Sequence, residues 1–349
     1  MSEQTGIAYV HSTWNVYCGC TLAPGCEVRN RCWAAALAKV RGWNFEKPHL
    51  YWGKDVWRHP YRWDEVARRA RMCRLVFASD LGDLFQDHIV VNRLRSRVWK
   101  VIRETPNVLY YLSNKVPENI TRFLPTDWGE GYSNVWLAVT VTSSKTLHRM
   151  DILRDVPAAL RAVSAEPLWH LLTNINLSGF GWLIIGGESG PQWSRSPMRL
   201  SWARELWAKA RKSDCAYFFK QVSGLRDEYG IDALDRLSFG KTGGALQARR
   251  RPKTPFPLQP MPEKGIRFTD EEWMRYREAE EAVSKRVRNP DTDVEFADPR
   301  SADDRLIRHS SGEAARCVQE EYGVLPMDDE CRTTASKSSP RAAKRSGAL

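Results

Sequence analysis

The sequence predicts an α/β fold, a partial (β/α) barrel of about seven parallel strand–helix units with a largely disordered C-terminal extension. Two observations support this prediction. Short apolar runs begin at residues 74, 107, 134, 160, 182 and 215, and intervals of this size fit one strand and one helix. The runs do not alternate with polar residues, which is typical of strands buried on both faces of a parallel sheet. An open doubly wound sheet is the alternative.

Each strand of the predicted barrel corresponds to one of these runs, and Gly6–Tyr9 is predicted to add one more strand before them. The first crossover helix is expected over Trp33–Val40. Another is expected over Ile89–Glu104, where apolar residues recur on one side at helical spacing. The six runs are Arg74–Ser79, Asn107–Ser113, Asn134–Val139, Leu160–Ser164, Trp182–Ile185 and Cys215–Phe219.

The chain beyond residue 225 follows a different pattern, so the barrel is predicted to span residues 1–225. Residues 226–268 are interpreted as a basic, proline-rich linker, because its closely spaced prolines exclude a helix. A helix is predicted over residues 269–288, where Thr269 and Glu272 have the spacing of a capping box. Residues 289–349 are polar and charge-mixed, which predicts disorder.

Composition and charge limit the class of protein. The chain has 53 Lys+Arg against 42 Asp+Glu, a net charge of +11. This excess favours a polyanionic partner, although a basic solvated surface produces the same excess. The candidate phosphate contacts are Arg93, Arg97 and Lys100, together with Arg249–Arg251 and Lys253. No apolar run is long enough to span a bilayer, and the first residues do not form a signal peptide. We therefore expect a cytoplasmic protein with no membrane partner.

Polar and ionisable residues follow nearly every predicted strand. In parallel α/β folds the carboxyl ends of the strands meet at one edge, where the active site forms. Any one of these residues alone would be ordinary loop polarity, but together they predict one lined pocket. The candidate catalytic residues are Asp80, Asp83, Lys115, Glu166 and Lys220.

A glycine-rich segment after the run at 182–185 is the most specific of these strand ends. Gly186 and Gly187 would let a ligand approach the backbone and expose peptide N–H donors. Glu188 would then accept from an ammonium group or a ribose hydroxyl. We predict a cofactor-binding segment of Gly186, Gly187, Glu188 and Ser189, the alternative being a glycine-rich turn with a solvated glutamate.

Four of the eight cysteines lie within fifteen residues, at positions 18, 20, 26 and 32. Cytosolic thiols stay reduced, so such a cluster indicates a metal or redox site before it indicates disulfides. Cys20, Cys26 and Cys32 are the candidate ligands of a 4Fe–4S cluster with one iron left open. Structural zinc is an alternative, with Cys18 or His11 as the fourth ligand. Free thiols are the remaining interpretation.

Several blocks of the sequence resemble a known family. The segments Trp14-Asn15, Gly19-Cys20-Thr21, Pro24-Gly25-Cys26 and Cys32-Trp33-Ala34 resemble the opening of the phage and bacterial three-Cys-motif proteins, a domain-of-unknown-function family of the mycobacteriophage type. The resemblance covers residues 8–224 and leaves the tail outside. The further matching blocks are Ser79–Leu81 with Asp83–Phe85, Asn134–Leu137 with Val139 and Val141, Ser164–Leu168, Gly186–Pro191 and Phe218–Gln221.

That family is similar to divergent radical S-adenosylmethionine enzymes. The resemblance implies a partial (β/α) barrel, a 4Fe–4S cluster on Cys20, Cys26 and Cys32, and S-adenosylmethionine on the open iron. It also implies that Glu188 meets the methionine amino group. This sequence departs from the pattern, since five residues separate Cys26 from Cys32 where the family has two. Trp33 replaces the usual tyrosine, and residues 112–117 keep only part of the family's usual Thr-Lys-Arg-Pro. Because of this longer spacing, Cys18 is an alternative cluster ligand.

Three hypotheses for function follow. The first is an iron–sulfur, S-adenosylmethionine-dependent enzyme that modifies a nucleic acid or nucleoside, in the host cytosol if the protein is phage-encoded. The second is a non-catalytic nucleic-acid-binding protein with structural zinc. The third is a partner subunit that has kept the barrel and lost catalysis, which implies a protein partner.

Overall fold

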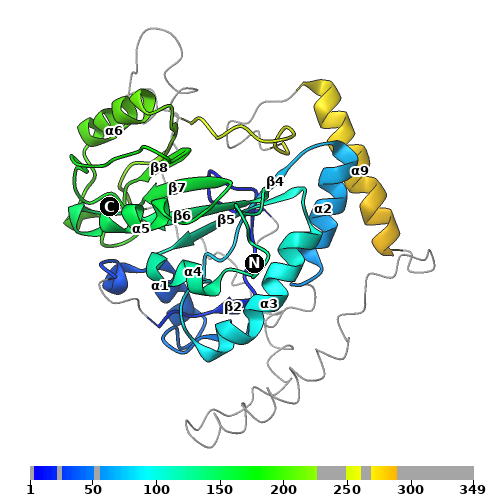
Figure 1. Cartoon of the computed structure of the whole chain (residues 1–349), viewed down its shortest axis with the longest axis horizontal. Helices are drawn as coiled ribbons and strands as arrows, with labels where there is room; N and C mark the ends of the chain where they lie inside the picture. Colours follow the sequence, from blue (N-terminus) through cyan, green and yellow to red (C-terminus); the bar gives the residue numbers. More distant parts are fainter. Residues whose placement is uncertain (1–3, 22–25, 51–55, 226–248, 261–268, 289–349) are drawn as a thin grey trace, which may run out of the picture. The chain divides into compact units, whose positions relative to one another are not determined.

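A computed structural model describes residues 4–21, 26–50, 56–225, 249–260 and 269–288 (Figure 1). All of these lie in the first of the two units into which the chain divides, Met1–Asp291. The predicted tail at 289–349 and most of the predicted linker lie outside the described residues. The boundary near residue 225 therefore stays a prediction.

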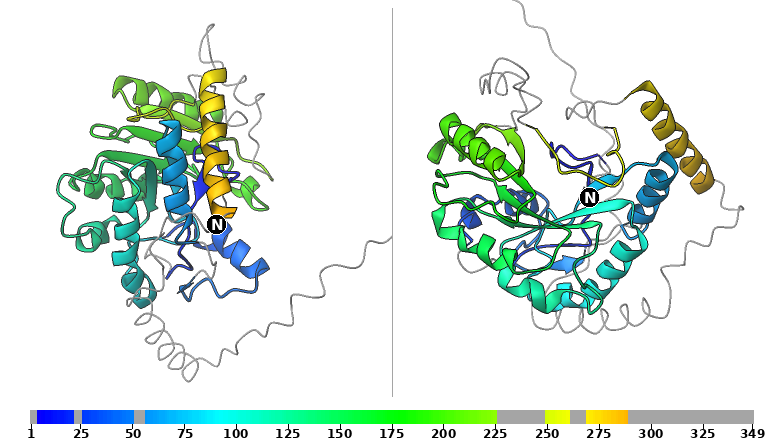
Figure 2. Two further views of the ribbon diagram at one scale, coloured as in Figure 1. Left: turned by 90° about the vertical axis from the view of Figure 1, so that its right-hand side faces the viewer. Right: turned by 45° about the horizontal axis from the view of Figure 1, so that its top comes forward.

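The described residues form a seven-stranded parallel sheet that curls into a half-barrel (Figure 2). Its strands follow one another in chain order, whereas a doubly wound sheet reverses its order at a switch point. The predicted partial barrel is therefore confirmed, and the doubly wound alternative is wrong. The strands are β1 (Ser12–Thr13), β4 (Arg74–Phe77), β5 (Val108–Asn114), β6 (Val135–Thr140), β7 (Leu160–Ala165), β8 (Trp182–Gly186) and β9 (Ala216–Gln221).

Helices cover the outer face of this sheet and leave its inner face to enclose a separate core. Strands β2 (Tyr17–Cys18) and β3 (His49–Leu50) form a small antiparallel pair. The α-helices are α1 (Trp33–Val40), α2 (His59–Ala70), α3 (Ile89–Glu104), α4 (Ile120–Phe123), α5 (His148–Arg154), α6 (Leu200–Lys212) and α9 (Asp270–Arg288). Short 3₁₀ turns are η1 (Arg29–Arg31), η2 (Pro117–Asn119), η3 (Ser144–Thr146) and η4 (Trp193–Arg195).

Aromatic side chains fill the inside of the half-barrel. The Trp182 ring lies edge-on to Tyr111 and to Trp136, with ring centroids 5.7 and 5.6 Å apart. Tyr9 and Phe218 pack against the same indole. Such edge-to-face pairs stabilise a core beyond the area that they bury. The interior of the half-barrel is therefore packed with side chains and is not a pore.

The sequence prediction of the elements is confirmed for β4 to β9, α1 and α3, but it is wrong at the first strand. Residues 6–9 form turns, and β1 is the polar pair Ser12–Thr13, which pairs with Val76 and Phe77 of β4. The apolar character of residues 7–10 reflects burial inside the barrel, where Tyr9 packs, and not a strand.

Residues 249–260 form no helix, as predicted, but they bind to the barrel. The Arg250 N–H donates to the Tyr217 carbonyl (2.8 Å), and the Cys73 N–H donates to the Pro257 carbonyl (2.7 Å). The guanidinium of Arg249 donates to two carbonyls of β9. The guanidinium of Arg251 donates to the Ala8 carbonyl and lies 4.7 Å from the centre of the Phe218 ring. These two arginines therefore have partners within the barrel, and their role as phosphate contacts stays a prediction.

Helix α9 begins at the capping box predicted from the sequence. The Glu272 N–H donates to Thr269 Oγ1 (3.2 Å), and the Thr269 N–H donates to Glu272 Oε2 (2.9 Å). One side of α9, with Ala279 and Val283, packs against α2 (Figures 1 and 2).

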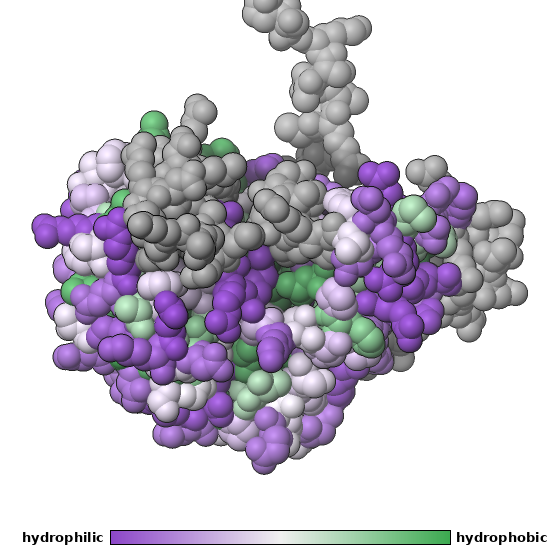
Figure 3. Space-filling model, turned by 90° about the horizontal axis from the view of Figure 1, so that it is seen from above, coloured by the Kyte–Doolittle hydropathy of each residue, from purple (hydrophilic) through white to green (hydrophobic). Residues whose placement is uncertain are grey.

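One face of the molecule is mostly polar. Hydrophilic side chains make up most of the face drawn in Figure 3, with hydrophobic residues in small patches between them. No described helix is long and apolar enough to cross a membrane.

Candidate active site

A cavity of about 700 Å³ lies at the carboxyl ends of the strands. Its walls come from the segment that carries the cysteines, from the loop after β4, and from the ends of the five strands β5 to β9. All the predicted catalytic and metal-binding residues line it, as do Gly187, Glu188 and Ser189. The structure therefore brings the predicted strand-end residues and the three cysteines together at one cavity, while their catalytic and metal-binding roles stay predictions.

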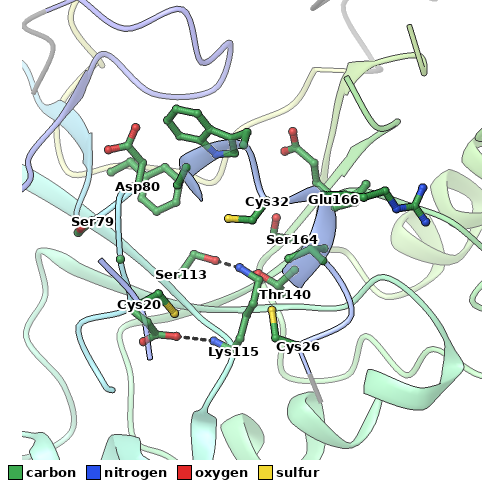
Figure 4. Close-up of a pocket in the computed structure, with 18 of the residues that line it drawn as sticks. Cys20, Cys26, Cys32, Ser79, Asp80, Ser113, Lys115, Thr140, Ser164 and Glu166 are labelled. Carbon is green, nitrogen blue, oxygen red and sulfur yellow. Dashed lines mark hydrogen bonds between the residues drawn. The ribbon is translucent and has the colours of Figure 1, made fainter. Parts of the chain in front are cut away.

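Four residues with hydroxyl groups line the cavity side by side. Ser79, Ser113, Thr140 and Ser164 come from four neighbouring strand ends (Figure 4), and the hydroxyls of Ser113 and Thr140 are 3.4 Å apart. Side chains alternate along a strand, so residues two positions earlier face the same way. In the first two strands these residues are Phe77 and Tyr111, which belong to the inner core. The cavity therefore has polar groups placed over an apolar floor.

Three thiols face this space. Cys20, Cys26 and Cys32 are partly exposed and line the same cavity (Figure 4). Burial raises the pKa of Cys26, and the nearby Lys115 ammonium opposes this effect. Among the described residues, no group of three His, Cys, Asp or Glu side chains is arranged to hold a single metal ion.

The two other candidate ligands lie elsewhere. Cys18 is fully buried in an apolar cluster with Ala34, Ala38 and Phe45, and burial raises its pKa to about 11. Both ring nitrogens of His11 lie within hydrogen-bonding distance of backbone carbonyls, those of Leu75 and Gln259. Neither residue lines the cavity, so the geometry gives no support to either as an extra ligand.

The two predicted aspartates have different surroundings. Burial raises the pKa of Asp80, which accepts a hydrogen bond from the Asn15 amide. Asp83 is buried, which raises its pKa as well, and its two oxygens accept from the backbone N–H groups of Phe85 (3.0 Å) and Lys115 (2.8 Å). Asp83 thus ties the loop after β4 to the end of β5, whereas Asp80 is placed at the cavity wall.

Glu166 and Lys220 form an ion pair in the cavity, although they come from β7 and β9. Strand β8 lies between them, and its residue at this level is Gly186. A Cβ atom at position 186 would lie 3.2 Å from Glu166 Cδ. The missing side chain therefore leaves room for the carboxylate to reach the ammonium group.

The second glycine of the segment is needed by the fold. A Cβ atom at Gly187 would lie 2.2 Å from the backbone nitrogen of Ser223, and the Gly187 N–H donates to the Gln221 carbonyl (2.9 Å). We expected this glycine to expose its N–H to a ligand, and the structure corrects this. The chain that follows β9 packs so closely here that it occupies that position.

Glu188 is buried and already paired. Its Oε2 atom accepts from Arg31 (2.7 Å) and from the indole N–H of Trp169 (2.8 Å). The Arg31 guanidinium also lies over the Trp169 ring, 4.1 Å from its centre. Sequence reasoning missed Arg31 and Trp169, because single residues outside the strands and the α-helices have no periodicity that would mark them.

Several of the blocks that carry the family resemblance contribute residues to this cavity, among them Ser79–Leu81, Ser164–Leu168 and Gly186–Pro191. A family model described as "Protein of unknown function (DUF5131)" matches residues 4–284. The chain belongs to this family. Comparisons with curated proteins and with solved structures gave no match. The DUF5131 match includes most of α9, so the expectation that the family pattern ends at residue 224 is wrong. The physical reason is that residues 249–260 and α9 bind to the barrel and to α2.

Proposed function

We propose that the cavity is the active site of an iron–sulfur, S-adenosylmethionine-dependent enzyme that modifies a nucleic acid or nucleoside. The observation that carries this proposal is that three thiols and the polar strand ends line one cavity of about 700 Å³. That space is larger than a single ion needs and sufficient for a cofactor with part of a substrate.

The donor set fits a 4Fe–4S cluster on Cys20, Cys26 and Cys32. Thiolates are the usual protein ligands of such clusters, and each thiolate binds its own iron. The three sulfurs therefore need not converge on one point, which agrees with the lack of a single-ion site in the described residues. Three protein ligands leave one iron open. When bound, the cluster would supply an electron to the sulfonium of S-adenosylmethionine.

The chain's own residues would bind and orient the two organic molecules. The amino group of S-adenosylmethionine is proposed to bind Glu188 through the oxygen that Arg31 does not use. The Glu166–Lys220 pair and the four hydroxyl groups would orient the substrate, while the aromatic floor excludes water. Trp33 follows Cys32, lines the cavity and has 53% of its surface exposed, which offers an indole face for stacking a base.

Anaerobic reconstitution tests this function. The full chain is incubated with iron, sulfide, a reductant and S-adenosylmethionine, and bound metal and 5′-deoxyadenosine are measured. Iron with sulfide and release of 5′-deoxyadenosine are expected, and both should be lost when all three cavity cysteines are replaced by alanine. Zinc without iron would contradict the proposal and favour the nucleic-acid-binding alternative. Bound iron without cleavage would contradict catalysis and favour the partner-subunit hypothesis.

A further inference from the structure

We propose that Glu27 and Arg31 are positioning residues that fasten the segment between Cys26 and Cys32 to the mouth of the half-barrel. This segment, residues 27–31, is called the inter-cysteine segment. The proposal concerns how two thiols are held at the cavity and does not depend on which group they bind.

Arg31 fastens one end of the segment. Its guanidinium donates to Glu188 Oε2 (2.7 Å) and to Ser196 Oγ (3.3 Å), and it stacks on Trp169. The side chains of Arg31 and Glu188 are 17% and 7% exposed. A charge-assisted hydrogen bond so well shielded from water is stronger than a surface pair. Arg31 directly precedes Cys32, so it fixes the position of that thiol.

Glu27 fastens the other end. Its carboxylate accepts from the Thr142 hydroxyl and pairs with Arg149 at 3.4 Å. The Arg149 side chain is only 3% exposed and also donates to the Thr140 carbonyl (2.8 Å). Glu27 directly follows Cys26, so this contact is the counterpart of the one at Arg31.

The two contacts have opposite polarity. The half-barrel contributes a buried cation, Arg149, and a buried anion, Glu188, and each receives a countercharge from the inter-cysteine segment. Leaving a buried charge without its partner is costly, so closure of the segment over the mouth is favoured. The chain between Glu27 and Arg31 contains η1, a single 3₁₀ turn that ends at Arg31. A longer spacing between Cys26 and Cys32 therefore does not leave the thiols loosely held.

The segment contains a matched control. Arg29 is also an arginine of η1, but its side chain is 60% exposed and its nearest carboxylate oxygen, on Glu46, is 3.8 Å away. Arg29 carries the same charge as Arg31 and lies in the same 3₁₀ turn, but its ion-pair partner is exposed. Replacing Arg29 therefore changes the charge of the segment without releasing it from the barrel.

Thiol accessibility tests the proposal in the full chain, reduced and freed of metal by a chelator. Alkylation of each cysteine by iodoacetamide is followed by mass spectrometry. Arg31→Gln should raise the rate at Cys32 roughly tenfold, because losing a charged hydrogen bond raises the open population by about that factor. An effect of the lost positive charge alone would appear equally in Arg29→Gln, which removes the same charge from the same turn. Arg31→Lys should restore much of the protection, and Arg29→Gln should leave it unchanged.

The other end is tested without changing any charge. Thr142→Val keeps the shape of the side chain and removes the hydrogen bond to Glu27, so the rate at Cys26 should rise severalfold. Cys20 precedes both contacts and its N–H is held by the Phe45 carbonyl, so its rate should not change. Cys18 is buried, and its continued protection shows that the fold is intact.

Unchanged rates at Cys26 and Cys32 in the Thr142 and Arg31 variants would overturn the proposal. An equal rise at Cys18 or Cys20 would overturn it as well, because it would show general loosening. Since the protein carries no metal in this experiment, failure of the iron–sulfur function would leave its outcome unaffected.

Discussion

Glu166 and Lys220 form an ion pair across a strand that belongs to neither of them. The pair lies over Gly186 of β8 and joins the ends of β7 and β9 at the cavity. The glycine-rich segment therefore has a packing role in addition to the binding role proposed for it. Two of its glycines make room for neighbours, a carboxylate at 186 and a backbone segment at 187.

Alanine at the two glycines should destabilise the fold to different degrees. Gly186→Ala meets a side-chain atom at 3.2 Å that can move, so we expect a loss of about 1 kcal/mol. Gly187→Ala meets backbone at 2.2 Å and should lose about 3 kcal/mol or more. Urea unfolding measures both variants. Equal losses, or a larger loss at 186, would contradict this account.

Removing one partner of the Glu166–Lys220 pair should cost more than removing both. The side chains are 17% and 11% exposed, so Lys220→Met leaves a shielded carboxylate and should lose about 2 kcal/mol of unfolding free energy. Adding Glu166→Gln should recover part of that loss. Urea unfolding of the two single variants and the double variant gives the coupling energy. Strict additivity would show that the pair does not contribute to stability.

Asp80 should make the fold less stable as pH rises. Burial raises its pKa, and the hydrogen bond from Asn15 offsets this only in part. The folded state therefore binds the proton more tightly than the unfolded chain, so stability falls as pH rises above the usual carboxyl range. Asp80→Asn keeps an acceptor for Asn15 and has no charge to bury. It should be more stable than the wild type at neutral pH, with the difference vanishing near about pH 3. A variant of equal stability at both pH values would refute this.

The cysteines should divide into two groups, those that are needed for iron binding and those that are not. Cys20→Ala, Cys26→Ala and Cys32→Ala should each lower the iron content of reconstituted protein, because a three-ligand cluster has no spare anchor. Cys73→Ala and Cys215→Ala remove thiols that are buried in the apolar cores and should leave iron content unchanged. Cys18→Ala is the closest control, since Cys18 lies near the ligands in sequence but away from the cavity. A loss of iron in the Cys18 variant would shift the ligand assignment.

Sequence patterns predicted the half-barrel because buried parallel strands are continuous apolar runs, and every run from Arg74 to Phe219 became a strand. They failed at β1, where the strand is two polar residues and the neighbouring apolar ones fill the barrel. A two-residue strand is too short to show a pattern of apolar residues in the sequence.

The position of the site was predictable from the sequence, but the pairs that its charged side chains form were not. Residues such as Lys220 follow strands, so topology brings them to one edge. The partners of the two buried charges come from the short segment between Cys26 and Cys32, and no spacing links Arg31 with Glu188 or Glu27 with Arg149. The same holds for Arg251, whose basic neighbourhood suggests a phosphate contact although its guanidinium binds a backbone carbonyl.

Salt titration should separate structural arginines from those that bind a polyanion. Arg93 and Lys100 are exposed on α3 and are available for phosphates, whereas burial lowers the pKa of Arg251 to about 9. If the protein binds duplex DNA, each of Arg93→Gln and Lys100→Gln should flatten the log–log salt slope by about 0.9. Arg251→Gln should leave the slope unchanged and instead lower unfolding free energy, because the Ala8 carbonyl loses its donor. Filter binding at several salt concentrations with duplex DNA, paired with urea unfolding, measures both effects. A flatter slope in the Arg251 variant, at unchanged stability, would keep that residue among the candidate nucleic-acid contacts.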